Sequence, residues 1–401
     1  MTSPTMPEAN RNASGIVYMD YATATPVHAD VLREMIPYFS ERFGSPSQIY
    51  SLGQQAAEHV QEARLLTSRL IGARAKHIYF TSGATEANNW AIKGAAGKLR
   101  DKGNHIITSA TEHSSILDPC RLLEKQGIQV TVLPVDRYGL VSPEDVRAAI
   151  TDKTILITIG HGNIEVGTIN PVPEIGAVAR ERGILFHTNA AQTAGKIEID
   201  VEKLQCDLLS FSAHKFYGPK GVGALFMAKP KLIDPLHQGG SQERNIRGGT
   251  HNVPGIIGMG KAAELALANM AEQAEHINTL RDQLRDGLIE RIKDIQIVGH
   301  PTDRVPGNLA VCVDGVEGEA MLLHLDMNGV CVSSGSACTA GTLDPSHVLL
   351  AMGLSHEQAH GSIRFSLGVQ NTDAHVDHVL DVFPKIVDTL RKMSPTYPSK
   401  G

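Results

Sequence analysis

Short apolar runs alternate with stretches of helical spacing between Lys76 and Phe211. The runs are rich in Ile, Val, Leu and Phe, as in HIYF, HIIT and TILITI. Apolar runs of this length, separated by helical segments, are typical of buried parallel strands joined by crossover helices. Strands are expected near residues 77–80, 105–108, 128–133, 154–159, 183–187 and 207–211, with helices at 84–98, 114–126, 143–150 and 173–182.

The pattern changes after a glycine-rich stretch at residues 239–249. A long helical pattern over 255–293 follows, of a kind that can link two domains. The remainder mixes the two element types, with strands near 308–313 and 362–367 and helices near 318–327 and 375–393.

These patterns define an expected domain organisation. A chain of 401 residues is longer than a single hydrophobic core usually supports, so two domains are expected. We therefore predict an α/β protein with a polar, disordered tail at 1–15, a large domain with a mostly parallel sheet at 16–265, and a smaller α+β domain at 266–401.

Composition excludes several classes of function. The net charge is −6 and no Lys/Arg-rich block occurs, so nucleic acid is not an expected partner. Neither a membrane span nor a secretory signal is indicated, because no run of about 18 apolar residues occurs and the amino terminus is polar; a cytoplasmic protein is therefore expected. The five cysteines are scattered without a C-x-x-C pair, so no disulfide framework and no metal site is predicted.

The most informative segment is SFSAHKFYGPKGVGAL, in which Lys215 follows an apolar strand and precedes a glycine-rich turn. Ligands of open α/β sheets bind at the carboxyl ends of strands, and a desolvated lysine there can form an imine with an aldehyde cofactor. A lone lysine at a strand end is more often a solvated loop residue. The assignment therefore depends on the surrounding sequence.

Two further segments carry candidate chemistry. FTSGATEANN predicts a strand, a small-residue turn and a helix that starts near Ala84 and Thr85, where free N–H groups attract an anion. An isolated G-x-T is, however, often only a turn and a helix cap. His113 comes directly after a strand, where it can serve either in proton transfer or as a structural hydrogen-bonding group.

The S-x-H-K sequence followed by Y-G-P-K-G-x-G resembles the lysine motif of cysteine desulfurases of the IscS/NifS type, which are class V aminotransferase-like enzymes. The resemblance runs from about Ile16 to Pro395 and includes FTSGATEANN, TEH, RGGTHNV and SIRFSLG. It implies the type I fold of transferases that depend on pyridoxal 5′-phosphate (PLP). It also implies that Lys215 holds PLP as a Schiff base.

The resemblance assigns roles to further residues. His113 would stack on the pyridine ring and take part in proton transfer, and Arg364 would bind the carboxylate of the substrate, L-cysteine, at two points. Thr250 would reach the phosphate from a second subunit, which implies a homodimer. The residues expected around the cofactor are Ala84, Thr85, Asn189, Gln192, Ser212, His214 and Thr250.

Cys338 lies in VSSGSACTAG, a loop of small residues that leaves the thiol uncovered, whereas the other four cysteines lie in apolar or helical patterns. In the family, the loop cysteine attacks the sulfur of the substrate, which gives alanine and an enzyme persulfide. The expected acceptor is a sulfur-acceptor or iron-sulfur scaffold protein. The sequence identifies neither this acceptor nor the preference between cysteine and selenocysteine.

Several positions depart from the family pattern. Asn189 stands where the family has an aspartate facing the pyridine nitrogen, Ile164 replaces the second of two adjacent asparagines, and Ser45 replaces the asparagine of G-N-P. One hypothesis is an active desulfurase with altered or reduced efficiency. The alternative is a desulfurase-like protein that binds a partner of sulfur or iron-sulfur assembly without chemistry of its own. Another PLP reaction is less favoured because it leaves Cys338 without a role.

Overall fold

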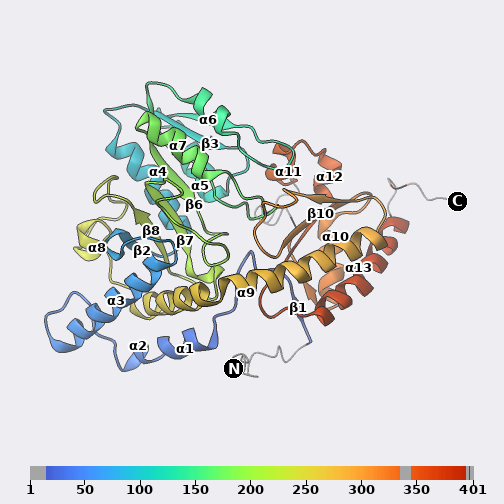
Figure 1. The fold of residues 1–401 in the computed structure, drawn as a ribbon, viewed down its shortest axis with the longest axis horizontal. Coiled ribbons are helices and arrows are strands. Elements are labelled where there is room, and N and C mark those ends of the chain that lie inside the picture. Colours follow the sequence, from blue (N-terminus) through green and yellow to red (C-terminus); the bar gives the residue numbers. More distant parts are fainter. Residues whose placement is uncertain (1–14, 335–344, 394–396, 398–401) are drawn as a thin grey trace.

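The computed structural model describes residues 15–334, 345–393 and 397. The long helix α9 (Val253–Arg291) runs along one side of the molecule, past a large sheet with its helices and then past a smaller group of strands and helices (Figure 1). The 39 residues of this helix contribute to both groups.

A seven-stranded sheet forms the centre of the larger group, in the order β2-β8-β7-β6-β5-β3-β4. Strand β8 runs antiparallel to both of its neighbours, and the other pairs are parallel. The strands are β2 (Ile78–Thr81), β3 (His105–Ser109), β4 (Gln129–Leu133), β5 (Thr154–Thr158), β6 (Leu185–Asn189), β7 (Leu208–Ser212) and β8 (Gly223–Met227). The expected mostly parallel α/β sheet is confirmed.

Helices cover both faces of this sheet. Because side chains alternate along a strand, Ile78 and Phe80 enter one hydrophobic cluster and Tyr79 enters another. The Tyr79 side is covered by α4 (Ala84–Lys98) and α5 (Ser114–Glu124). The opposite side is covered by the first half of α9 together with α1 (Ala29–Met35), α2 (Pro37–Ser40), α3 (Ser51–Arg69), α6 (Pro143–Ala149) and α7 (Val172–Arg182).

The smaller group is built on a three-stranded antiparallel sheet in the order β12-β10-β9. Its strands are β9 (Ile295–Val298), β10 (Asn308–Val313) and β12 (Ser362–Ser366). The second half of α9 packs here with α10 (Gly318–Met327) and α13 (Asp373–Met393). The short helices α11 (His347–Ala351) and α12 (His356–His360) contribute to a separate cluster with β9 and β10.

The amino-terminal segment belongs in space to this smaller group. Strand β1 (Val17–Tyr18) pairs in parallel with β11 (Val330–Cys331), and Val17 and Met19 enter the same cluster as α13. Along α9, the cluster changes between Ala266 and Ile277. The domain limits 16–265 and 266–401 remain a prediction.

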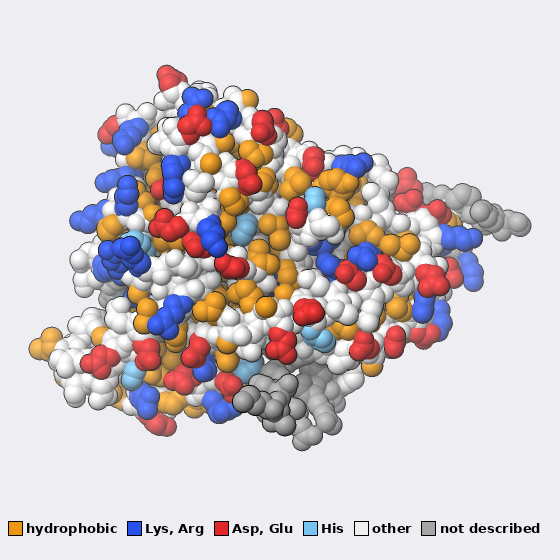
Figure 2. All heavy atoms as spheres, viewed as in Figure 1, with side chains coloured by type: hydrophobic (Ala, Val, Ile, Leu, Met, Phe, Trp, Pro, Cys, Tyr) orange, Lys and Arg blue, Asp and Glu red, His pale blue; other side chains and the backbone are white. Residues whose placement is uncertain are grey.

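Charged side chains of both signs lie on the face of the molecule that Figure 2 shows. On the face shown in Figure 2, acidic and basic side chains are interspersed without a continuous basic stripe. Within the part of the chain that the structure describes, no helix is both long and apolar enough to span a bilayer.

Candidate active site

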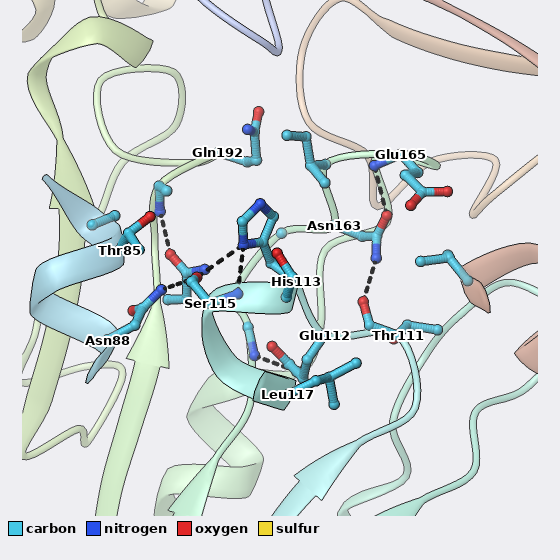
Figure 3. A pocket seen from close by; sticks show the side chains of 18 of the residues that line it. Thr85, Asn88, Thr111, Glu112, His113, Ser115, Leu117, Asn163, Glu165 and Gln192 are labelled. Carbon is cyan, nitrogen blue, oxygen red and sulfur yellow. Dashed lines mark hydrogen bonds between the residues drawn. The ribbon is translucent and has the colours of Figure 1, made fainter. Parts of the chain in front are cut away.

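A cavity of about 440 Å³ opens at the carboxyl ends of the parallel strands. This is the edge of an open α/β sheet where ligands bind, and the volume suits a molecule of cofactor size. Figure 3 shows side chains from several elements pointing into it. The predicted site residues that line it are Ala84, Thr85, His113, Asn189, Gln192, Ser212, His214 and Lys215.

Lys215 lies just past the end of β7, in a 3-10 turn formed by Ala213–Lys215. Its side chain is buried, and Nζ donates hydrogen bonds to the carbonyl oxygens of Ala22 at 2.6 Å and Thr23 at 2.8 Å. Peptide carbonyls hold the amine in place without the full negative charge of a carboxylate. The amine is therefore positioned at the cavity wall by the returning amino-terminal segment.

An anion cradle lies beside this lysine, at the start of α4. The N-cap residue, Gly83, has no side chain to cap the helix, and the N–H of Ala84 donates to Ser212 Oγ at 2.6 Å. The cradle needs close backbone packing, because a Cβ on Gly223 would lie 2.6 Å from the Cα of Gly83. An uncapped helix start of this kind attracts phosphate.

His214 lies at the same wall of the cavity. Burial, with smaller contributions from the nearby charges of Lys215 and Lys220, lowers the pKa of His214 to about 4. The imidazole is therefore neutral at neutral pH, and it can donate one hydrogen bond without adding a full charge.

His113 caps the start of α5, where its Nδ1 accepts a hydrogen bond from the backbone N–H of Ser115. Its pKa is lowered from the usual value, first by burial and then by the charges of Lys215 and His347. His113 therefore meets the cavity as a neutral ring. His113 thus caps a helix and also lines the cavity, and its part in proton transfer remains a prediction.

Two polar side chains on the β6 side complete this part of the wall. Asn189 Oδ1 accepts from the N–H of Ala191 at 3.1 Å, and its Nδ2 has no hydrogen-bond partner among the described residues. Gln192 is buried and donates to the carbonyl of Ala22 at 3.0 Å. Asn189 consequently offers the cavity an N–H donor.

Arg364 on β12 lies beside the cavity but does not line it. Its guanidinium donates to Asp20 at 2.6 Å, to Thr23 Oγ1 at 2.9 Å and to the carbonyl of Ile164 at 3.2 Å. The Nε atom of this buried arginine has no hydrogen-bond acceptor in the described ranges. Ile164 itself lines the cavity, so the arginine reaches the site through the turn that contains Ile164.

Other predicted positions lie apart from the cavity. Thr250 is exposed and lines no part of it, and Ser45 lies in the connection between α2 and α3. Cys338 lies outside the described residues. Burial is the first cause that raises the thiol pKa of Cys120 and Cys312 to about 12.

Two buried carboxyl groups line the cavity and were not predicted from the sequence. Glu112 accepts from the Gly160 N–H at 2.8 Å and from a serine hydroxyl, and Glu165 accepts from Ser346 Oγ. Burial raises the pKa of each to about 7. Their only sequence signal is position, since Glu112 directly precedes His113 and Glu165 follows Ile164.

The donor set suits a phosphate-bearing aldehyde better than a metal ion. Within the described residues, no cluster of three or more His, Cys, Asp or Glu could hold a metal. A buried amine, an uncapped helix start and a neutral imidazole instead surround one cavity of adequate size. These residues fit PLP.

Comparison with known proteins supports this chemistry. The aminotransferase class-V family matches residues 17–379. The cysteine desulfurase IscS of Methanosarcina thermophila is 52% identical over 384 residues, which cover 96% of this chain and 95% of that protein.

Solved structures give the same result. A NifS-like protein superposes with a TM-score of 0.88 at 37% identity, covering 94% of this chain and all of that one. The structure of SspA in complex with cysteine superposes with a TM-score of 0.78 at 37% identity, covering 89% of this chain and all of that one. The expected type I fold of PLP-dependent transferases is confirmed. The chain belongs to the aminotransferase class-V family and, within it, to the PLP-dependent cysteine desulfurases of the IscS type.

Proposed function

We propose that this pocket converts L-cysteine to L-alanine and transfers the sulfur to Cys338 as a persulfide. In this reaction the C–S bond of the substrate breaks, an S–S bond forms at the Cys338 thiolate, and a proton replaces sulfur on the substrate carbon. The observation that carries the proposal is the buried Lys215 amine at the wall of a cavity that also contains an uncapped helix start.

The cofactor would be held by residues of the large sheet. Lys215 would bind it covalently, and the start of α4 with Ser212 and His214 would bind its phosphate. When bound, PLP supplies an electron sink for negative charge that develops on the substrate. Gln192 would contact the ring substituents from the opposite wall.

Arg364 would bind the substrate carboxylate. Its orphaned Nε donor supports this role, because a buried N–H without an acceptor is costly and a carboxylate would supply one. Asp20 already neutralises the guanidinium, so the substrate must compete with this carboxylate. The structurally similar SspA was solved in complex with cysteine, which supports an amino-acid substrate of this kind.

The described cysteines are poor candidates for the sulfur acceptor. Cys120, Cys206 and Cys312 are buried, and burial raises the pKa of each thiol. The pKa of the half-buried Cys331 is also raised, again first by burial. A thiolate is the reactive form, which leaves the family position Cys338 as the proposed acceptor.

Asn189 supports the proposal of altered efficiency. Its Oδ1 is occupied by Ala191, so the group directed to the ring would be an N–H donor where the family has an acceptor carboxylate. A donor favours an unprotonated pyridine nitrogen and therefore a weaker electron sink. The same observation favours the second candidate, a partner-binding protein without turnover.

A homodimer completes the proposed site. Thr250 is exposed and does not reach the cavity of its own chain, so its role requires a second copy. An apolar surface for such a copy lies on α1, α2, α3 and their connections, with exposed side chains at Leu32, Ile36, Phe39, Phe43, Ile49, Tyr50 and Leu65. We propose that a sulfur-acceptor or iron-sulfur scaffold protein then takes the persulfide.

The visible spectrum of the purified protein with PLP and the release of alanine from L-cysteine test the proposal together. A cofactor band, stoichiometric persulfide and alanine support it, with loss of all three in Lys215→Ala and loss of persulfide in Cys338→Ala. A cofactor band without alanine would favour the partner-binding alternative. No band and no alanine would reject the enzyme.

A further inference from the structure

A hydrogen-bonded chain of three residues lies behind His113. Asn88 on α4 donates from Nδ2 to Ser115 Oγ at 2.8 Å, and this oxygen lies 2.9 Å from His113 Nδ1. The backbone N–H of Ser115 donates to the same Nδ1 at 3.0 Å. Asn88 is fully buried and Ser115 is 7% exposed, so solvent does not compete for these bonds.

The directions of these bonds determine where His113 carries its proton. A backbone N–H can only donate, so Nδ1 must present its lone pair. Asn88 donates to the hydroxyl oxygen of Ser115, which leaves the hydroxyl hydrogen to point at Nδ1 as well. A neutral imidazole has one N–H, and this proton must therefore be on Nε2.

The other edge of the ring points into the cavity, between Ser115 and Gln192 (Figure 3). Nε2 has no hydrogen-bond partner within the residues that the structure describes. The pKa of His113 is lowered by burial and by the charges of Lys215 and His347, with a smaller opposite effect of Asp118, so the neutral form is favoured.

We propose that Asn88 and Ser115 are positioning residues that hold neutral His113 in the tautomer with its proton on Nε2. This tautomer gives the bound ligand a hydrogen-bond donor and withholds a basic lone pair at that atom. The proposal rests on the proposed function only for the identity of the ligand. In the proposed reaction, a proton leaving the substrate must then go to a group other than neutral His113.

The tautomer can be measured without turnover. We suggest ¹⁵N-histidine labelling of the full chain and two-bond ¹H–¹⁵N spectra, with and without PLP, using His113→Gln to identify the His113 signals among the 18 histidines. The expected result is an unprotonated shift at Nδ1 and a protonated shift at Nε2. A protonated Nδ1 with an unprotonated Nε2 would overturn the proposal.

Asn88→Asp tests the role of the chain behind the ring. A carboxylate at this position accepts the Ser115 hydroxyl hydrogen, turns it away from Nδ1 and adds negative charge, so the pKa of His113 should rise by about one pH unit. Asn89→Asp places the same charge on a partly exposed neighbour of α4 and is expected to leave the His113 titration unchanged. Equal shifts in the two variants, or no shift in either, would contradict a specific role.

Ser115→Ala separates the hydroxyl from the backbone donor. The Nε2–H tautomer should persist, because the backbone N–H remains, while the Nδ1 signal shifts with the loss of one donor. A switch to the other tautomer, or an unmoved Nδ1 signal, would reject the assigned geometry. These readouts are independent of activity, so an Nε2–H tautomer without alanine production would reject the proposed function and leave this inference intact.

Discussion

The two sides of the pocket differ in how their cations are held. On the cofactor side, Lys215 contacts two neutral carbonyl groups and lies beside an uncapped helix start. On the substrate side, Arg364 is already paired with the Asp20 carboxylate. An anionic substrate group must therefore displace the Asp20 carboxylate, whereas the helix start on the cofactor side holds the N–H of Ala84 against a neutral hydroxyl.

The two sides also differ in how the chain builds them. The cofactor side comes from β2 and β7, which lie on either side of β8 in one sheet, at residues 80–85 and 210–215, and each piece is a continuous motif. The substrate side joins Asp20, Ile164 and Arg364 from three distant segments. Continuous motifs can be found in a sequence, but an ion pair between residues 20 and 364 depends on the tertiary fold.

The largest expected effect is on the cofactor side. Lys215→Ala should abolish the visible cofactor band and lower kcat/KM for cysteine by at least about a thousandfold, because the variant loses the amine proposed for covalent attachment. Absorbance and alanine release measure both effects. Lys220→Ala removes an exposed lysine of the same segment and should keep the band. A normal band in Lys215→Ala would contradict the assignment.

On the substrate side, Arg364→Lys should raise KM for cysteine by about 10- to 100-fold, because lysine cannot bond a carboxylate at two points. The cofactor band should remain, which distinguishes the substrate side from the cofactor side. Steady-state kinetics with Arg100→Lys, an exposed change of the same kind, provides the control. An unchanged KM would remove Arg364 from the substrate site.

Asn189→Asp tests the proposed contact between residue 189 and the pyridine nitrogen of PLP. We expect kcat for cysteine to rise by about two- to tenfold, because a carboxylate would accept from a protonated pyridine nitrogen and raise its pKa. Asn189→Ala, which supplies neither donor nor acceptor, should not reproduce the gain. An unchanged or lower rate in Asn189→Asp would show that this position does not limit turnover.

Asp20→Asn tests whether this aspartate competes with the substrate for Arg364. Loss of the competing carboxylate should lower KM by about two- to fivefold, while the free energy of unfolding falls by about 1–3 kcal/mol because Arg364 loses its counter-charge. Kinetics and denaturant unfolding measure the two effects on one protein. A higher KM would mean that Asp20 orients the arginine for the substrate and does not compete with it.

The smallest effect on turnover is expected from a change at Glu112. Its main expected effect is on how the free energy of unfolding depends on pH. Its pKa is raised by burial to about 7, so below about pH 4.5 the carboxyl is protonated in both folded and unfolded chains. As pH rises towards 7, the unfolded chain releases its proton first, and up to about 3 kcal/mol of stability is lost.

Denaturant unfolding of Glu112→Gln at pH 5 and pH 8 checks the expected loss of stability with rising pH. The variant should lose less stability than the parent between the two values, because its amide does not titrate. Glu124→Gln, an exposed change at the end of the helix α5 that follows Glu112, should behave like the parent. A larger loss in Glu112→Gln than in the parent would contradict the pKa direction.

Much of the fold follows from local pattern. The helices 84–98 and 318–327 and the strand 308–313 are predicted at their observed limits. Strand β8 is predicted only as part of a glycine-rich turn, since its Gly223 is required by close packing against Gly83 and breaks the apolar run.

The rest of the site depends on tertiary contacts. The buried Glu112 and Glu165 cannot be separated from solvated carboxylates by their spacing, and only burial raises the pKa of each. The proton position on His113 follows from Ser115 and Asn88, which come from two different helices. Neither burial nor bond direction can be obtained from residue order alone.

The attachment point of the cofactor is the most direct test of the proposed active site. A second lysine, Lys196, is close enough to Lys215 for the two charges to interact, and burial is the first cause that lowers its pKa to about 7. Borohydride reduction of the PLP-loaded protein, followed by peptide mass spectrometry, distinguishes the two amines. We expect the cofactor mass on the peptide that contains Lys215. Attachment to Lys196, or no attached cofactor, would contradict the proposed active site.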